Sequence, residues 1–388
     1  MQTITDVYAR LGVRRVINAT CHWTRFGGTV MPPPVLDAMR AAAEAYVDLY
    51  ELQDAASRVI ARHCHSQAGY VVSGCAAALM VGAAAVMTGD DPAAMARLPD
   101  TAGLKSEWIA RRLDRRRAPA GDEYVHHGYA QAVRGAGGRF VEVGEPAGVT
   151  LDQIAAAFGR QTAGVYWVAA QPPNTPTPEE VIDLAHRRGV PILIDASNTL
   201  PPAEHLHRFV DAGADLVAFS GGKGLRGPQG SGFLAGRADL IAAARKQAAP
   251  TQGIGRVCKV SKEEIVGLLT ALELWAAQDH RAAARAAEKK TRWLYDQLGG
   301  LTNAEVDYVD PDHIGRPYPT VHVRLDPDEG PTGAELLKRL LEGTPPVAAM
   351  AGSDRHTIRL DVRELSEPDV QRVADAVLAA LMPGSVGR

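Results

Sequence analysis

Two short apolar runs place the strongest limit on how this chain can fold. The first, Val190–Ile194, ends in Asp195, and the second, Leu216–Phe219, leads directly into the glycine-rich turn Ser220–Pro228. Short apolar runs that are bounded by turn residues are typical of buried strands. Their alternation with helical patterns predicts an α/β fold, in which crossover helices join the strands of a mostly parallel sheet.

The same order of strands and helices repeats up to about Thr251. We expect strands at Tyr70–Val72, Glu123–Val125, Arg139–Val143, Gly164–Val168, Ile192–Asp195, Leu216–Phe219 and Gly232–Ala235. We expect helices at Val35–Leu52, Asp54–Cys64, Cys75 to about Thr88, Tyr129–Ala136, Leu151–Phe158, Pro178–Arg188 and His207–Ala212. The stretch Pro99–Gly121 is expected to be the least regular. Its basic run, Arg111–Arg117, is interpreted as a solvated helix face and loop, with contact to an anionic ligand or RNA as the alternative.

Several polar residues stand at or just after predicted strand ends, among them Ser73, His126, Asp195 and Lys223. Ligands of parallel sheets bind beyond the carboxyl ends of the strands, so these residues are expected to share one site. A lysine and an acid in such a site suit pyridoxal 5'-phosphate (PLP). The lysine forms a Schiff base with the cofactor, and the acid keeps the pyridine nitrogen protonated. An ordinary surface lysine and a helix-capping acid are the alternatives.

The segment Ser73-Gly74-Cys75-Ala76 joins a predicted strand to a predicted helix and is a candidate phosphate loop. Small residues there let backbone N–H groups approach a phosphate, and the helix dipole favours the negative charge. A common strand-to-helix turn is the alternative interpretation. Ser220 is placed to donate a hydrogen bond to the phosphate, and Ser197 is also assigned to the cofactor.

His126 and His127 end another predicted strand. A flat imidazole can stack on the cofactor ring, or it can polarise or protonate a substrate group. We favour His127 for this role, with two ordinary loop histidines as the alternative. No metal site is expected here or at His63–His65, because neighbouring helical side chains point apart and no carboxylate stands nearby in the sequence.

Basic residues elsewhere are candidates for anion and substrate binding. The glycine-rich, basic segment Thr251–Lys259 contains Arg256, which we assign to the cofactor. The substrate-binding candidates are Arg25, Lys259, Arg355 and Arg359. An arginine can hold a substrate carboxylate through two hydrogen bonds. Solvent exposure explains Arg359 equally well.

The chain is expected to have three parts. Residues 1–31 form an N-terminal segment that contributes to the active site, and residues 32–250 form the large PLP-binding domain. Residues 251–388 carry a long helix or a broken pair, Lys262–Leu298, and a small C-terminal α+β domain.

The net charge, the apolar stretches and the cysteine spacing limit the partners and the cellular compartment that we expect for this chain. A net charge of -3 gives no general attraction to nucleic acid or membranes. The sequence shows no signal-peptide pattern at its start, and no apolar stretch approaches the roughly 18 to 20 residues of a membrane span. The four cysteines have no CxxC spacing, which fits free thiols in a reducing cytoplasm. We expect a cytoplasmic protein with a small-molecule substrate.

Taken together, several segments resemble one group of fold-type-I PLP enzymes, the selenocysteine synthase (SelA)-like branch that includes D-glucosaminate-6-phosphate ammonia lyase. The matching segments are Ile17–Thr20, Thr24–Gly28, Val72–Leu79, Phe140–Gly144, Ile194–Ala196, Ser220–Lys223, Ile254–Arg256, Lys259-Val260 and Lys262–Glu264. The resemblance implies a homodimer or higher oligomer with sites at subunit interfaces. It implies Lys223 as the Schiff-base lysine and Asp195 on the pyridine nitrogen. It also implies that Arg256 and Lys259 reach the site from the neighbouring subunit.

The chemistry expected of such a site is a reaction at Cα and Cβ of an amino acid. Lys223 removes the α-proton and a group at Cβ then leaves, as in an ammonia lyase or a dehydratase. An amino-acid racemase or epimerase is the first alternative, and an aldolase or aminotransferase is less favoured. The non-enzymatic alternative is an RNA- or partner-binding protein that retains the fold.

Overall fold

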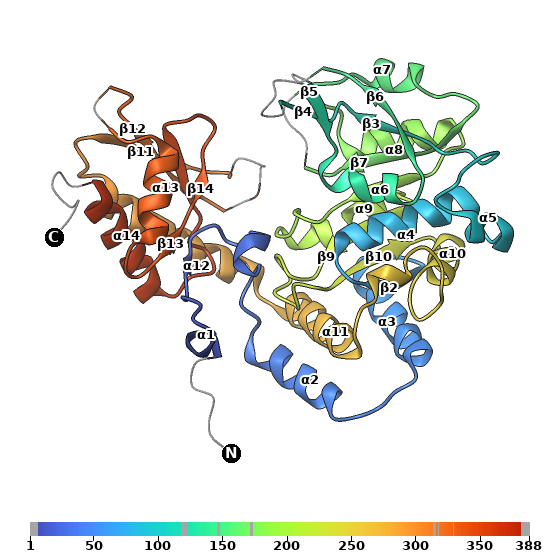
Figure 1. Cartoon of the computed structure of the whole chain (residues 1–388), viewed down its shortest axis with the longest axis horizontal. Helices are drawn as coiled ribbons and strands as arrows, with labels where there is room; N and C mark the ends of the chain where they lie inside the picture. Colours follow the sequence, from blue (N-terminus) through green and yellow to red (C-terminus); the bar gives the residue numbers. More distant parts are fainter. Residues whose placement is uncertain are drawn as a thin grey trace. The chain divides into compact units, whose positions relative to one another are not determined.

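The structure is a computed structural model that describes residues 7–117, 123–145, 148–170, 174–312, 316, 318–328 and 330–381. The chain forms two compact units. The large unit is Val30–Gln278, and the small unit combines Met1–Thr29 with Asp279–Arg388. The small unit therefore combines described residues from the first and the last parts of the sequence, which are the dark blue and the orange to red segments of Figure 1.

A seven-stranded sheet forms the centre of the large unit. Its order is β2 (Ala68–Val72), β10 (Gly232–Gly236), β9 (Leu216–Ser220), β8 (Ile192–Asp195), β7 (Thr162–Val168), β3 (Glu107–Arg111) and β6 (Arg139–Val143). β10 is antiparallel to both of its neighbours, whereas the pairs from β9 to β6 are all parallel. The prediction of a mostly parallel α/β sheet is confirmed.

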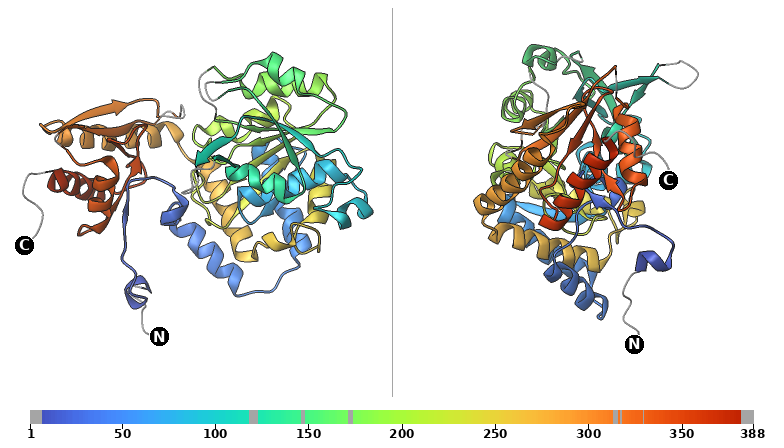
Figure 2. Two further views of the ribbon diagram at one scale, coloured as in Figure 1. Left: turned by 45° about the horizontal axis from the view of Figure 1, so that its top comes forward. Right: turned by 90° about the vertical axis from the view of Figure 1, so that its left-hand side faces the viewer.

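Helices pack on both faces of this sheet (Figures 1 and 2). Along β2, Val71 enters one apolar cluster, while Tyr70 and Val72 enter the other, because successive strand residues point to opposite faces. The first cluster includes residues of α3 (Leu49–Cys64), α8 (Pro178–Arg187) and α11 (Lys262–Ala277). The second includes residues of α4 (Cys75–Thr88), α6 (Gln131–Gly135) and α10 (Ala238–Gln247). The strands are therefore buried on both faces, which explains why their sequences are apolar throughout and do not alternate with polar residues.

The small unit is built on a second sheet. Its strands are β11 (Ala304–Val309), β12 (Thr320–Leu325), β15 (Thr357–Leu360) and β14 (Met350–Ala351), all antiparallel. Its helices are α1 (Val7–Arg10), α12 (His280–Leu298), α13 (Gly333–Glu342) and α14 (Glu367–Leu381). β1 (Ile17–Asn18) pairs in parallel with β13 (Val347–Ala348), which ties the N-terminal segment to the C-terminal part.

Two sequence expectations about the region before residue 130 are wrong. β3 lies inside the sheet, between β7 and β6, although it falls in the stretch expected to be least regular. The basic run is not a helix face: Arg111 ends β3, and β4 (Asp114–Arg117) pairs with β5 (Glu123–His126) in a separate two-stranded sheet. The predicted strand at 123–125 therefore exists but does not join the main sheet. β3 was hard to recognise because charged residues stand at both ends of its short apolar centre, Trp108–Ala110.

The helices also differ from expectation at their ends. Two helices lie between Pro33 and Cys64 as predicted, but the break between them falls earlier than the predicted boundary at Leu52–Asp54. α2 (Pro33–Ala43) ends before this boundary, and α3 begins after Asp48, whose side chain accepts a hydrogen bond from Tyr50 N. Lys262–Leu298 is the broken pair, since Asp279 caps the start of α12. The shorter helices are α5 (Pro92–Arg97), α7 (Leu151–Ala156) and α9 (Arg208–Asp211). Within the described residues, no helix combines the length and the apolar character that crossing a membrane requires.

Gly232 allows the start of α4 to lie against β10. A Cβ at this position would lie 2.5 Å from Gly74 C, 2.6 Å from Cys75 N and 2.7 Å from Phe219 O. All three are backbone atoms, so the start of the helix would have to move. We expect Gly232→Ala to lower the free energy of unfolding by about 1–3 kcal/mol, measured by denaturant titration.

Gly159→Ala is the matched control, because a Cβ at Gly159 meets no atom within 4 Å. Its free energy of unfolding should change by less than about 0.5 kcal/mol. Equal stability of the two variants would contradict the close approach of β10 and α4.

Candidate active site

The first turn of α4 forms one side of the candidate site. The helix is capped by Gly74, whose φ of 88° lies in the region that glycine adopts easily, and a Cβ there would meet only open space. The first backbone N–H groups of a helix have no acceptor within it, and they carry its partial positive charge. The small residues that follow Gly74 leave these groups accessible. Ser73 lies within hydrogen-bonding reach of the Cys258 thiol.

Asp195 lies at the carboxyl end of β8, opposite Val168 of β7 and Ala218 of β9. Its side chain is buried, with the residue 3% exposed. The phenol of Tyr166 donates to Oδ2 at 3.2 Å. Oδ1 accepts from Ser197 N at 3.0 Å and from the Cys75 thiol at 3.7 Å. These three donors are neutral groups.

The two side-chain donors remain protonated near neutral pH. Burial, followed by the charge of Asp195, raises the pKa of Tyr166 well above its usual range. The same two causes, in the same order, raise the pKa of the Cys75 thiol. Cys75 is therefore a hydrogen-bond donor here rather than a thiolate nucleophile. A carboxylate that is buried among neutral donors is suited to a cationic ligand group.

Lys223 lies in a tight turn that starts at the end of β9. Gly221 N donates to Ser231 O at 2.9 Å, and Gly227 N donates back to Gly221 O at 2.8 Å. Glycine is needed within the turn, because a Cβ on Gly224 would lie 2.6 Å from Leu200 O. These hydrogen bonds close the turn, and the turn holds the half-buried Lys223 just beyond the end of β9.

Lys223 and Asp195 both lie close enough to Cys75, in the first turn of α4, to shift the pKa of its thiol. The charge of Lys223 lowers the pKa of the Cys75 thiol, whereas the charge of Asp195 raises it. Lys223 Nζ lies 5.6 Å from the centre of the Tyr129 ring, in a cation–π contact. The structure thus brings together the lysine, the acid and the helix start that the sequence singled out.

A pocket of about 260 Å³ lies beside Asp195. Tyr166, the donor to Asp195, lines it together with Ala110, Arg111, Arg112, Leu113, Asp114, His126, His127, Gly128, Val168 and Ala170. Partial burial, and then Arg134 with its Nη1 3.4 Å from Nδ1, lower the pKa of His127. The pocket therefore offers a neutral imidazole at neutral pH, alongside two arginines at the end of β3.

The remaining predicted residues divide between the two units. Arg256, in η4 (Arg256–Cys258), and Lys259 belong to the large unit, and Cys258 of this turn approaches Ser73 of the same chain. The substrate candidates Arg25, Arg355 and Arg359 belong to the small unit. There, Arg359 Nε donates to Ala351 O at 3.0 Å. The roles of all five residues stay predictions.

Sequence reasoning missed two tyrosines. Tyr166 lies within a buried strand, and Tyr129 lies in the short turn after the paired histidines. A signal for Tyr166 existed, because the hydroxyl of a buried tyrosine normally requires a hydrogen-bond partner. Nothing in the sequence near Tyr129 indicates its contact with Lys223.

Known proteins resemble this chain over most of its length. The profile of the aminotransferase class-V family matches residues 174–327. A 5'-C-glycyluridine monooxygenase-decarboxylase of a Streptomyces species is 32% identical over 354 residues, which are 88% of this chain and 84% of the relative. A D-glucosaminate-6-phosphate ammonia lyase of Salmonella typhimurium is 28% identical over 343 residues, or 87% of each chain. A solved structure of D-glucosaminate-6-phosphate ammonia-lyase has a TM-score of 0.78 at 27% identity, and the match covers 98% of this chain and 100% of that one.

The fold is that of the fold-type-I PLP-dependent enzymes, with a large, mostly parallel sheet and a smaller C-terminal sheet. Within that class, the chain belongs to the SelA-like family that includes D-glucosaminate-6-phosphate ammonia lyase. The resemblance seen in the sequence motifs is confirmed.

The hydrogen bond from Tyr166 to Asp195 can be tested by Tyr166→Phe. Removing the hydroxyl takes one donor from a buried carboxylate, so the free energy of unfolding should fall by about 1–3 kcal/mol. Denaturant titration of the protein without added cofactor measures this change. Tyr124→Phe is the control, because Tyr124 is 46% exposed. A loss no larger than that of the control would show that the phenol contributes little to Asp195.

Proposed function

We propose that this protein is a PLP-dependent lyase that removes the α-proton of an amino acid and eliminates a group from Cβ. The burial of Asp195 among neutral donors is the observation that supports this proposal most strongly. The ammonia lyase among its relatives supports the reaction type. Members of the family depend on PLP, which supports the choice of cofactor.

The residues at the site fit this cofactor. Asp195 offers a buried anion to a protonated ring nitrogen, and the start of α4 offers backbone N–H groups and open space to a phosphate. Lys223 would hold the cofactor aldehyde, with Ser73 and Ser220 as further phosphate donors. When bound, PLP accepts the electron pair that remains at Cα after the proton has been removed.

The protein's own groups then supply the proton chemistry. The Lys223 amine takes the proton from Cα of the substrate, for which it must be unprotonated. Asp195 would hold a protonated ring nitrogen through a charge-assisted hydrogen bond. Tyr166 and Cys75 keep their own protons, so they remain neutral hydrogen-bond donors to this carboxylate. His127 is neutral and lines the adjacent pocket, so it can donate or accept a proton at the leaving group on Cβ.

A second candidate reaction is oxidative decarboxylation. The relative named as a 5'-C-glycyluridine monooxygenase-decarboxylase has a higher identity, 32%, than the lyase, 28%. In that reaction Cα would lose carbon dioxide and dioxygen would be consumed. Oxygen uptake with a candidate amino acid, measured with an oxygen electrode, separates this candidate from a lyase, which needs no oxidant.

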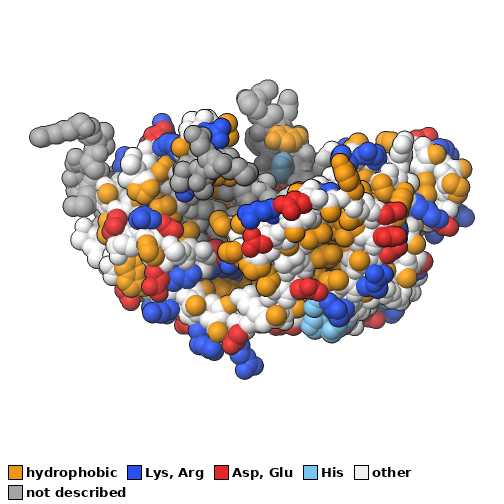
Figure 3. Space-filling model, turned by 90° about the horizontal axis from the view of Figure 1, so that it is seen from below, with side chains coloured by type: hydrophobic (Ala, Val, Ile, Leu, Met, Phe, Trp, Pro, Cys, Tyr) orange, Lys and Arg blue, Asp and Glu red, His pale blue; other side chains and the backbone are white. Residues whose placement is uncertain are grey.

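We also propose that the protein is a cytoplasmic homodimer or higher homo-oligomer that acts on a small-molecule amino-acid substrate and binds neither nucleic acid nor membranes. Large apolar side chains on and just after α2 are exposed, among them Leu36, Tyr46 and Val47. Apolar side chains are frequent on the face of the large unit seen from below in Figure 3. Contact with a second copy would cover such residues. The cysteines Cys21, Cys64, Cys75 and Cys258 are unpaired, which supports a reducing compartment.

Lys223→Ala tests the catalytic lysine. We expect the substrate-dependent rate to fall at least about a hundredfold, because the base at Cα is lost. The visible absorbance of covalently held PLP should disappear, while the circular dichroism spectrum should remain that of the folded protein. Lys105→Ala, at an exposed lysine, is the matched control. Retention of the absorbance band in Lys223→Ala would contradict the assignment.

The type of reaction is tested in deuterated water with a panel of D- and L-amino acids. A lyase that eliminates a group from Cβ releases a ketoacid together with ammonia in step with substrate loss, because the enamine left after elimination hydrolyses. A racemase instead incorporates deuterium at Cα without forming ketoacid. Deuterium incorporation alone would contradict the proposed elimination and favour the racemase.

A further inference from the structure

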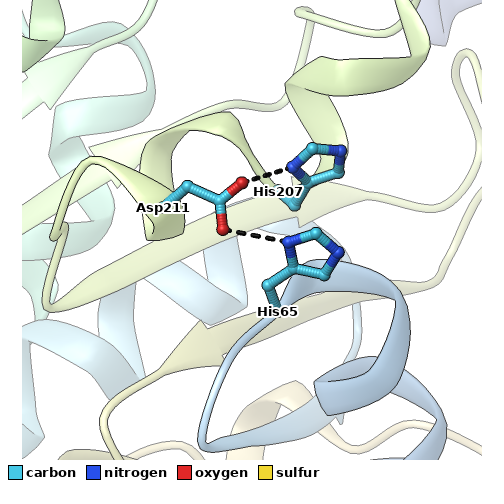
Figure 4. A group of neighbouring side chains, drawn as sticks. All are labelled: His65, His207 and Asp211. Atoms are coloured by element: carbon cyan, nitrogen blue, oxygen red, sulfur yellow. Dashed lines mark hydrogen bonds and ion pairs between the residues drawn. The ribbon is translucent and has the colours of Figure 1, made fainter.

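Two histidines and one aspartate form a cluster on the large unit that shares no residue with the candidate active site. His65 ends α3, while His207 and Asp211 stand at the two ends of α9. Their possible ligand atoms all lie within 4.8 Å of one another. Figure 4 shows that both imidazoles turn their Nδ1 atoms towards the same carboxylate.

The three side chains of the cluster lie close together. His65 Nδ1 lies 2.9 Å from Asp211 Oδ1, and His207 Nδ1 lies 2.6 Å from Asp211 Oδ2. The two rings are stacked, with their centres 4.1 Å apart and their planes inclined by 25°. His207 and Asp211 are four residues apart, the spacing that places helical side chains on one face.

We propose that this cluster binds a divalent transition-metal ion of the Zn²⁺ type through Nδ1 of both histidines and the carboxylate of Asp211. Zinc lies about 2.0–2.1 Å from imidazole nitrogen and about 2.0–2.2 Å from carboxylate oxygen. Ligand atoms around a tetrahedral ion are therefore about 3.3 Å apart, so each N–O contact would lengthen by a few tenths of an ångström as the ion replaces the two hydrogen bonds. The ion binds between these atoms, and each imidazole carries its proton on Nε2.

The two imidazole nitrogens and the carboxylate determine which metal ions the cluster can bind. Imidazole nitrogen suits Zn²⁺, Ni²⁺, Co²⁺ and Cu²⁺, whereas Mg²⁺ and Ca²⁺ prefer oxygen ligands. The side chains of His65, His207 and Asp211 are 53%, 33% and 46% exposed, so water can complete the coordination. The nearest cation in the sequence, Arg208, is paired with Glu179 at 2.6 Å, which offsets its repulsion of a metal ion.

No carboxylate stands near His65 in the sequence, and no metal site is expected there on that basis. The fold supplies one by bringing α9 to the end of α3. His65 is fixed at this end because it adopts the left-handed conformation, with φ of 53°, and donates its N–H to Ala61 O. A bound ion would link α3 to α9 and stabilise the large unit.

The test titrates the full-length protein, loaded with PLP, with ZnCl₂ by calorimetry and follows its thermal midpoint. We expect one ion per chain and a higher midpoint with Zn²⁺, but no effect of Mg²⁺ or Ca²⁺. His65→Ala, His207→Ala and Asp211→Asn should each weaken zinc binding at least about tenfold and abolish the rise in midpoint. Asp211→Asn keeps the shape of the side chain. Its zinc affinity can therefore be measured even if the alanine variants unfold.

His63→Ala is the matched control, because His63 lies in the same turn of α3 but outside the cluster. It should bind zinc as the wild type does. Unchanged zinc affinity in His207→Ala and Asp211→Asn would overturn the proposal, as would the absence of stoichiometric binding. A thiolate-to-metal absorbance band with Co²⁺ would also overturn it, because it would assign the ion to a cysteine.

Discussion

The buried carboxylate of Asp195 is the constraint on which the candidate site depends. Transfer of an ionised carboxylate from water to a protein interior costs on the order of several kcal/mol, and neutral hydrogen bonds recover only part of this. Tyr166, Cys75 and Ser197 N supply such bonds to Asp195. A cationic group recovers more. The Lys223 ammonium lies in the same site, and a ligand whose charge is positive where it meets Asp195 would add to this stabilisation.

The sheet places the other groups around this carboxylate. β8 carries Asp195 and lies between β7, which supplies Tyr166, and β9, which leads into the turn of Lys223. β10 lies on the far side of β9, and its Gly232 leaves room for the start of α4. A base, an anion and a helix N-terminus therefore meet at one edge of the sheet because parallel strands end there together. These are the parts that PLP chemistry requires, which explains how the family fold supports the proposed reaction.

Local patterns in the sequence predicted part of this site. Asp195 follows one apolar run directly, and Lys223 stands in the glycine-rich turn that follows another, so their places at strand ends could be inferred without knowing the strand order. Tyr166 could not be placed in the same way, because its partner depends on the register that sets Val168 opposite Asp195. The same limit applies to His65, since its neighbours His207 and Asp211 come from a distant segment. β3 was missed for a different reason: its short apolar centre is flanked by charged residues, and only its neighbours in the sheet bury it.

The protonation state of the cofactor ring tests the central claim most directly. Nitrogen-15 NMR of the protein loaded with PLP labelled at the pyridine nitrogen reports whether that nitrogen carries a proton. The account predicts a protonated nitrogen in the wild type across the neutral pH range, and an unprotonated nitrogen in Asp195→Asn. An unprotonated ring nitrogen in the folded, cofactor-loaded wild type would contradict the role given to Asp195.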